Sequence, residues 1–124
     1  MAKILIVDDD DVIRDTLYEL LSTDYDCESA STAQTALSKL EQEAFDVVVT
    51  DISMPGLSGV ELLSSVLKHY PKTPVIIVSG ISDQEQAERL LKLGAFDYVL
   101  KPFRLEVVET SVKRALKYRR AQLA

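Results

Sequence analysis

Apolar and polar residues follow one another along the chain in blocks that predict five β-strands, each followed by an α-helix. The predicted strands are short, nearly continuous apolar runs, which are typical of strands that a parallel sheet buries on both faces. The second run is the most polar of the five, which favours a place at an edge of the sheet. The runs lie at residues 3–7, 25–30, 45–50, 74–79 and 96–100.

Between these runs, apolar residues recur at intervals of three and four, as expected for amphipathic helices. Ser58 is suited to cap the third helix, and Ser82 with Glu85 has the capping-box spacing at the start of the fourth. Gly94 suits a left-handed position at the end of the fourth helix. The last helix is predicted over residues 105–120. Its core-facing stripe comprises Leu105, Val108, Val112, Ala115 and Leu116.

Regular alternation of strands and helices predicts an α/β fold, a doubly wound five-stranded parallel sheet with five helices on its two faces. The first and third strands can then lie side by side at a topological switch point, which is the flavodoxin-like strand order 2-1-3-4-5. A length of 124 residues is typical of one domain. We assign residues 1–120 to this domain and residues 117–124 to a C-terminal helix extension or linker to a further, output domain.

The composition and charge of the chain restrict the classes of protein to which it can belong. The chain is 47% hydrophobic and 27% charged, as expected for a globular domain, and its formal charge of −6 argues against nonspecific binding of nucleic acid. Cys27 is the single cysteine, so no internal disulfide can form, which is consistent with a reducing compartment. The sequence shows no secretory signal and no apolar run near the roughly 20 residues that span a bilayer. We therefore expect a cytoplasmic protein that does not enter the membrane.

Polar residues stand where four of the predicted strands end: Asp8 and Asp9, Asp51, Ser79 and Lys101. The carboxyl ends of parallel strands meet at one edge of the sheet, where ligands bind in open α/β folds. Each residue alone also has an ordinary explanation, as a helix start, a turn or a surface charge. Their convergence favours a site, and because clustered carboxylates repel one another, we expect a hard divalent cation such as Mg²⁺ to compensate.

The same edge is suited to phosphoryl chemistry. The ammonium group of Lys101 and the hydroxyl group of Ser79 could stabilise the charge of an incoming phosphoryl group. Asp51 lies centrally and could be the nucleophile, because carboxylates form aspartyl phosphates.

The chain resembles the receiver domain of bacterial two-component response regulators, over nearly its whole length from Lys3 to about Arg120. The motifs that carry the resemblance are the acid pair in ILIVDD, VVVTDISMPGLSG, PVIIVSG and GAFDYVLKPF. The resemblance implies a phosphorylation-activated signalling switch. It also implies that the domain is not an enzyme, except that it catalyses its own phosphotransfer and autodephosphorylation.

The resemblance also implies the acceptor and the cation ligands. Asp51 would accept a phosphoryl group from a histidine kinase and would be a ligand of Mg²⁺ (or Mn²⁺). Asp9 would bind the cation directly, and Asp8 would act mostly through a water. The backbone carbonyl group of Ser53 would complete the protein ligands.

The remaining implied roles concern the switch. Lys101 would pair with the phosphoryl group, and its bond to Pro102 would be cis. Ser79 would hydrogen-bond the phosphoryl group, and Tyr98 would swing inward when Ser79 moves. The surface of the fourth helix, fifth strand and fifth helix would then change, to control an output domain or a partner.

The resemblance implies three kinds of partner: a sensor histidine kinase or phosphotransfer protein, a C-terminal output domain, and a second copy of the chain in a phosphorylation-dependent homodimer.

Two other classes of protein are alternatives to this interpretation. An aspartyl-nucleophile phosphatase typically has a general acid two residues after the nucleophile, where this chain has Ser53. A flavodoxin-like FMN carrier needs a hydroxyl- and glycine-rich phosphate loop after the first strand, where this chain has aspartates at positions 8–11.

Overall fold

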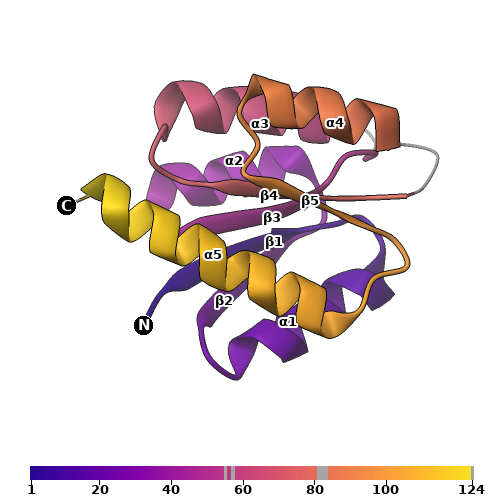
Figure 1. Ribbon diagram of the computed structural model, residues 1–124, viewed down its shortest axis with the longest axis horizontal. Coiled ribbons are helices and arrows are strands. Elements are labelled where there is room, and N and C mark those ends of the chain that lie inside the picture. Colours follow the sequence, from indigo (N-terminus) through magenta and orange to yellow (C-terminus); the bar gives the residue numbers. More distant parts are fainter. Residues whose placement is uncertain (55, 57, 81–83, 124) are drawn as a thin grey trace.

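Five parallel strands form a single sheet, in the order β2-β1-β3-β4-β5, in a computed structural model that describes residues 1–54, 56, 58–80 and 84–123. Five helices pack on this sheet within the described residues (Figure 1). The predicted fold class and strand order are therefore confirmed. The elements are β1 (Lys3–Val7), α1 (Asp11–Ser22), β2 (Asp26–Ala30), α2 (Ala33–Gln42), β3 (Val47–Asp51), α3 (Gly59–His69), β4 (Val75–Ser79), α4 (Gln84–Leu93), β5 (Asp97–Leu100) and α5 (Leu105–Leu123).

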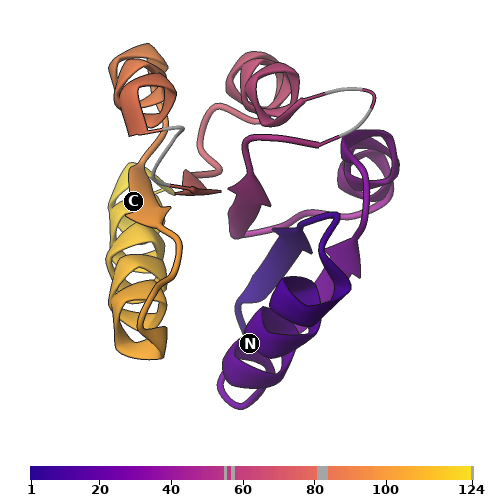
Figure 2. The ribbon, with the colours of Figure 1, turned by 90° about the vertical axis from the view of Figure 1, so that its right-hand side faces the viewer.

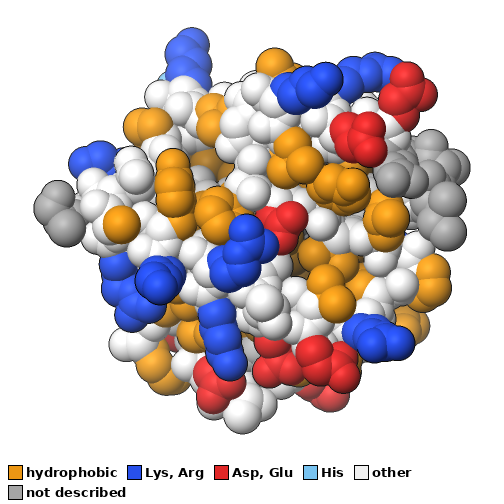
Figure 3. All heavy atoms as spheres, viewed as in Figure 1, with side chains coloured by type: hydrophobic (Ala, Val, Ile, Leu, Met, Phe, Trp, Pro, Cys, Tyr) orange, Lys and Arg blue, Asp and Glu red, His pale blue; other side chains and the backbone are white. Residues whose placement is uncertain are grey.

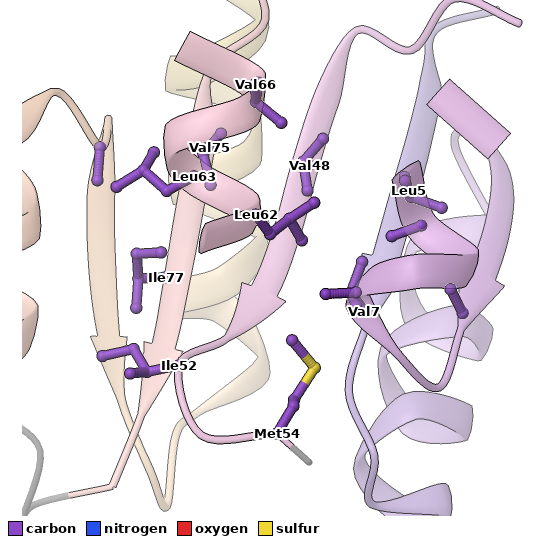
Figure 4. Close-up of a cluster of buried hydrophobic side chains, with 14 of the residues drawn as sticks. Leu5, Val7, Val48, Ile52, Met54, Leu62, Leu63, Val66, Val75 and Ile77 are labelled. Carbon is purple, nitrogen blue, oxygen red and sulfur yellow. The ribbon is translucent and has the colours of Figure 1, made fainter. Parts of the chain in front are cut away.

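The helices form two layers, with α1 and α5 on one face of the sheet and α2, α3 and α4 on the other (Figures 1 and 2). Successive side chains of a strand point to opposite faces. Leu5 of β1 therefore joins the core under α2–α4, whereas Ile4 and Ile6 join the core under α1 and α5. Figure 4 shows the first core, where Val48 lies close to Leu62 of α3. Burial on both faces explains why the strands are apolar throughout.

Several predicted strand starts and one expected core position differ from the structure, and the largest shift of a strand start is in β3. β3 begins at Val47 and includes Asp51, because the chain enters the strand only after Asp46, whose carboxylate accepts a hydrogen bond from the Lys3 backbone N–H (2.7 Å). Leu105 was expected in the core stripe of α5, but it is 41% exposed. It is the first residue of α5, one turn before Val108, where this helix first enters the core.

Two of the predicted helix signals can be followed in the structure. Ser58 caps α3 in a complete capping box with Glu61, and Gly94 has a positive φ of 129° after α4. The expected capping box at the start of α4 depends on Ser82, which lies outside the described residues. None of the helices in the described ranges is long and apolar enough to cross a membrane.

The last turns of α5 are attached to the amino-terminal edge of the sheet by Arg119. Its Nε donates to Asp46 Oδ1 (3.0 Å), and its Nη1 donates to the carbonyl oxygen of Lys72 (2.8 Å) and to Thr73 Oγ1 (3.2 Å). The helix itself continues to Leu123, three residues past its predicted end at residue 120. Figure 3 shows Lys and Arg side chains gathered over this part of α5. Along the whole of α5, the cationic residues are Lys113, Arg114, Lys117, Arg119 and Arg120.

Candidate functional site

Three aspartates that are distant in sequence meet at the carboxyl edge of the central strands. Val7 of β1 is paired with Thr50 of β3, so the next residues, Asp8 and Asp51, are neighbours. Asp8, Asp9 and Asp51 each offer a carboxylate oxygen, and these oxygens all lie within 4.8 Å of one another. Asp8 and Asp51 are buried, whereas Asp9 is exposed. The structure thus brings together all three acids that the sequence singled out.

Lys101 is the cation that faces these acids. Its Nζ lies 3.3 Å from Asp8 Oδ2 and 3.5 Å from Asp51 Oδ1. It follows β5, and its backbone N–H donates to the carbonyl oxygen of Ser79 at the end of β4 (2.7 Å). The peptide bond from Lys101 to Pro102 is cis, as expected. The ammonium group is therefore held between the two buried carboxylates.

Ser79 is fully buried at the end of β4, and its Oγ makes no hydrogen bond within the described residues. A buried hydroxyl group without a partner is unfavourable, so this one is available to a ligand. Tyr98 is opposite Ile77, two residues before Ser79 along β4, and its side chain packs against the core under α2–α4. The two predicted switch residues thus lie on neighbouring strands, Ser79 on β4 and Tyr98 on β5, and both strands end beside Lys101.

Three carboxylates gather beside the ammonium group of Lys101, so negative charge is in excess at the site. Burial raises the pKa of Asp51 from 3.8 to about 6; the neighbouring charge of Asp8 adds to the rise, and the ammonium of Lys101 opposes it. Burial also raises the pKa of Asp8, against the hydrogen bond from the Asp10 backbone N–H and the charge of Lys101. A cluster of hard carboxylate oxygens with this excess of charge fits Mg²⁺, which prefers oxygen ligands.

The loop after β3 is shaped by buried residues on both sides of Ser53. Ile52 and Met54 are buried in the core (Figure 4), and Ser53 between them is exposed. Gly59 closes the loop, because its N–H donates to the carbonyl oxygen of Ile52 (2.8 Å). A Cβ atom at Gly59 would lie 2.2 Å from the carbonyl oxygen of Asp51, so only glycine fits there. Sequence reasoning did not single out Gly59, although glycine is a poor helix former and here begins α3.

The consecutive aspartates at positions 8–11 make different contacts in the loop after β1. Asp10 is the N-cap of α1 and accepts hydrogen bonds from the backbone N–H groups of Val12 and Ile13. The N–H of Asp10 donates to Asp8 Oδ1 (2.9 Å). Sequence reasoning also missed Arg14, whose Nη1 donates to the backbone carbonyl oxygen of Asp8 (2.9 Å).

Comparison with known proteins agrees with this geometry. The family model of the response regulator receiver domain matches residues 4–113. The chain belongs to this family. A receiver domain is a phosphorylation-controlled switch of two-component signalling, and the match does not support the alternative of an aspartyl-nucleophile phosphatase.

Among curated relatives, the receiver domain is 39% identical over 117 residues to regulatory protein AtoC of Escherichia coli (strain K12), covering 92% of this chain and 25% of AtoC. It is 34% identical to response regulator protein FleR of Pseudomonas aeruginosa, covering 91% of this chain and 24% of FleR. The chain thus spans about a quarter of the length of these relatives.

Solved structures show the same fold. A response regulator receiver domain protein from Clostridium thermocellum is 32% identical, with a TM-score of 0.93 and full coverage of both chains. The receiver domain of NtrX from Brucella abortus is 34% identical, with a TM-score of 0.89 and coverage of 92% and 98%.

Proposed function

We propose that Asp51 is the residue that accepts the phosphoryl group in this receiver domain. The observation that carries the proposal is its position, buried beside Asp8 and 3.5 Å from the ammonium of Lys101, with a pKa of about 6. About nine tenths or more of this carboxylate is ionised above pH 7, so it is available as a nucleophile. The phosphoryl group would come from a phosphohistidine of a kinase or phosphotransfer protein, or from a small acyl phosphate.

In the transfer, an oxygen of Asp51 forms a bond to phosphorus as the bond from phosphorus to the donor breaks. The donor leaves with the electron pair of that bond, as imidazole from phosphohistidine or acetate from acetyl phosphate. Lys101 stands where it can pair with the phosphoryl oxygens, and Ser79 offers its unpartnered hydroxyl group. Attack by water on the product would release phosphate and restore Asp51, which is the autodephosphorylation we propose.

Asp8, Asp9 and Asp51, with the backbone carbonyl group of Ser53, would hold Mg²⁺ or Mn²⁺. When bound, the cation would supply positive charge to the reacting phosphoryl oxygens. The close approach of the acids and the raised pKa of Asp51 support this ligand set. We propose that Asp9, the exposed member, contributes most to affinity.

The response to phosphorylation would run from Ser79 to Tyr98. A hydrogen bond from the Ser79 hydroxyl to the phosphoryl group gives this residue the partner that it lacks among the described residues. The Tyr98 ring, half-buried on the neighbouring strand, would then move inward. The affected surface is α4, β5 and α5, and we propose that it contacts an output domain, a partner or a second copy of the chain.

We further propose that residues 117–124 extend the domain as a helical connection to an output domain. Two observations support this: α5 stays helical through Leu123, and the chain matches about a quarter of the length of AtoC and FleR.

Intact-mass spectrometry after incubation with acetyl phosphate tests the acceptor. The parent should gain one phosphoryl group when Mg²⁺ is present and none when the cation is chelated. Asp51→Asn should gain none, whereas Asp15→Asn, which changes an exposed acid of α1, should label like the parent. Equal labelling of Asp51→Asn and the parent would show that another residue is the acceptor.

A further inference from the structure

The buried backbone of Asp8 is held from both sides where β1 ends. Its N–H donates to the carbonyl oxygen of Ala30 at the end of β2 (3.2 Å). Its carbonyl oxygen accepts a hydrogen bond from Nη1 of Arg14, in the first turns of α1 (2.9 Å). An unpaired carbonyl group in a buried residue is costly, so this bond matters for the conformation of the loop.

The guanidinium of Arg14 is itself fixed in place. Its Nη2 lies 2.5 Å from Asp11 Oδ1, so its two terminal nitrogens bridge the end of β1 and the start of α1. The Arg14 side chain is only 17% exposed, whereas the Asp11 side chain is 81% exposed. The planar guanidinium is suited to such a bridge, because its donors point in set directions.

We propose that Arg14 is a positioning residue for the cation site, an inference that rests on the proposed role of Asp8 and Asp9 as cation ligands. By holding the Asp8 carbonyl group, Arg14 fixes the peptide unit that joins Asp8 to Asp9. The buried and the exposed carboxylate are thereby presented together to Asp51, within the 4.8 Å over which the three acids gather. Loss of the hydrogen bond lets this peptide unit turn and separates the ligands.

Charge alone predicts the opposite effect. Arg14 is a cation near a cation site, so removing its charge without any other change would strengthen the binding of Mg²⁺. The positioning role predicts weaker binding after the same substitution. The direction of the change in affinity therefore separates the two explanations.

Titration of the parent and variants with MgCl₂, followed by NMR chemical shifts and by calorimetry, tests the inference. Arg14→Met keeps the apolar stem without donors, and Arg14→Gln keeps a short polar group. Both should bind Mg²⁺ about tenfold more weakly, which corresponds to roughly 1.4 kcal/mol, the worth of about one hydrogen bond. Arg14→Lys, which retains one cationic donor, should recover most of the affinity.

Asp11→Asn is the matched control, because it removes the negative charge of the exposed partner of Arg14 and leaves the bond to Asp8 intact. Its affinity should stay within about twofold of the parent, the scale of one exposed charge pair. Urea unfolding of each variant separates loss of the fold from loss of binding.

Unchanged or tighter binding by folded Arg14→Met or Arg14→Gln would overturn the inference, as would equal weakening by Asp11→Asn. Failure of the parent to bind Mg²⁺ at all, or full affinity in Asp9→Asn, would instead overturn the proposed cation site. The two failures are therefore distinguishable.

Discussion

Replacing Asp51 with Asn should stabilise the folded domain at neutral pH. In the folded state the pKa of Asp51 is raised from 3.8 to about 6, so the folded chain holds this proton more tightly than the unfolded chain does. The unfolding free energy of the parent should therefore fall as the pH rises from about 4 to 6. Asn cannot lose a proton, so the variant avoids this loss of stability.

The expected gain in unfolding free energy follows from the pKa values of Asp51 in the unfolded and folded states. A tenfold change in proton affinity corresponds to about 1.4 kcal/mol, so the rise from 3.8 to about 6 gives an upper limit of about 3 kcal/mol above pH 7. As the pH falls through 3.8, the carboxyl group becomes protonated in the unfolded state as well, so the difference between Asp51→Asn and the parent should be small at pH 4 and approach zero below it. The side chain of Asp51 is only 8% exposed, so solvent screens little of this effect.

Urea unfolding of the parent and Asp51→Asn at pH 4 and pH 7.5, without divalent cations, measures the difference. Asp24→Asn, which neutralises an exposed acid after α1, controls for the change in net charge. Adding MgCl₂ at pH 7.5 should reduce the advantage of the variant, because the cation stabilises the parent. A gain that is the same at both pH values, or is matched by Asp24→Asn, would refute the reasoning.

Three further substitutions test the packing around the site and at α5. Gly59→Ala should destabilise the domain by about 3 kcal/mol in urea unfolding, because its Cβ would meet the Asp51 carbonyl oxygen; a cost below about 1 kcal/mol would contradict this. Arg119→Gln should cost about 2 kcal/mol and lower hydrogen-exchange protection at the end of α5, whereas exposed Arg120→Gln should cost less than about 0.5 kcal/mol; equal effects would contradict the anchoring role. Ser79→Ala should leave stability unchanged or raise it by up to about 1 kcal/mol, because its hydroxyl has no partner among the described residues, and it should reduce the NMR shifts that beryllofluoride induces at Tyr98; full shifts would contradict the coupling.

Most of the fold could be predicted from local patterns. Val47 to Val49 are apolar without interruption, which predicts burial on both faces, and the helical spacing between strands predicts the alternation of elements. Parallel sheets allow few topologies, so the alternation and the acids at the strand ends together predicted the strand order and the edge at which the site lies. The strand boundaries were less accurate, because Asp46 is turned toward the backbone of Lys3, 43 residues away in sequence.

The chemistry of the site was also visible early, because aspartates, a serine and a lysine each follow a strand directly. The contacts that hold these groups in place could not be predicted in the same way. Gly59 is required by a backbone oxygen of Asp51, Arg14 by a carbonyl group left free where β1 ends, and Arg119 by groups on two distant loops. Periodicity and strand ends are properties of neighbouring residues, so the sequence alone carries them. The raised pKa of Asp51 and these backbone contacts arise only in the folded chain, which removes water from the Asp51 carboxylate and brings together groups that no periodic pattern links.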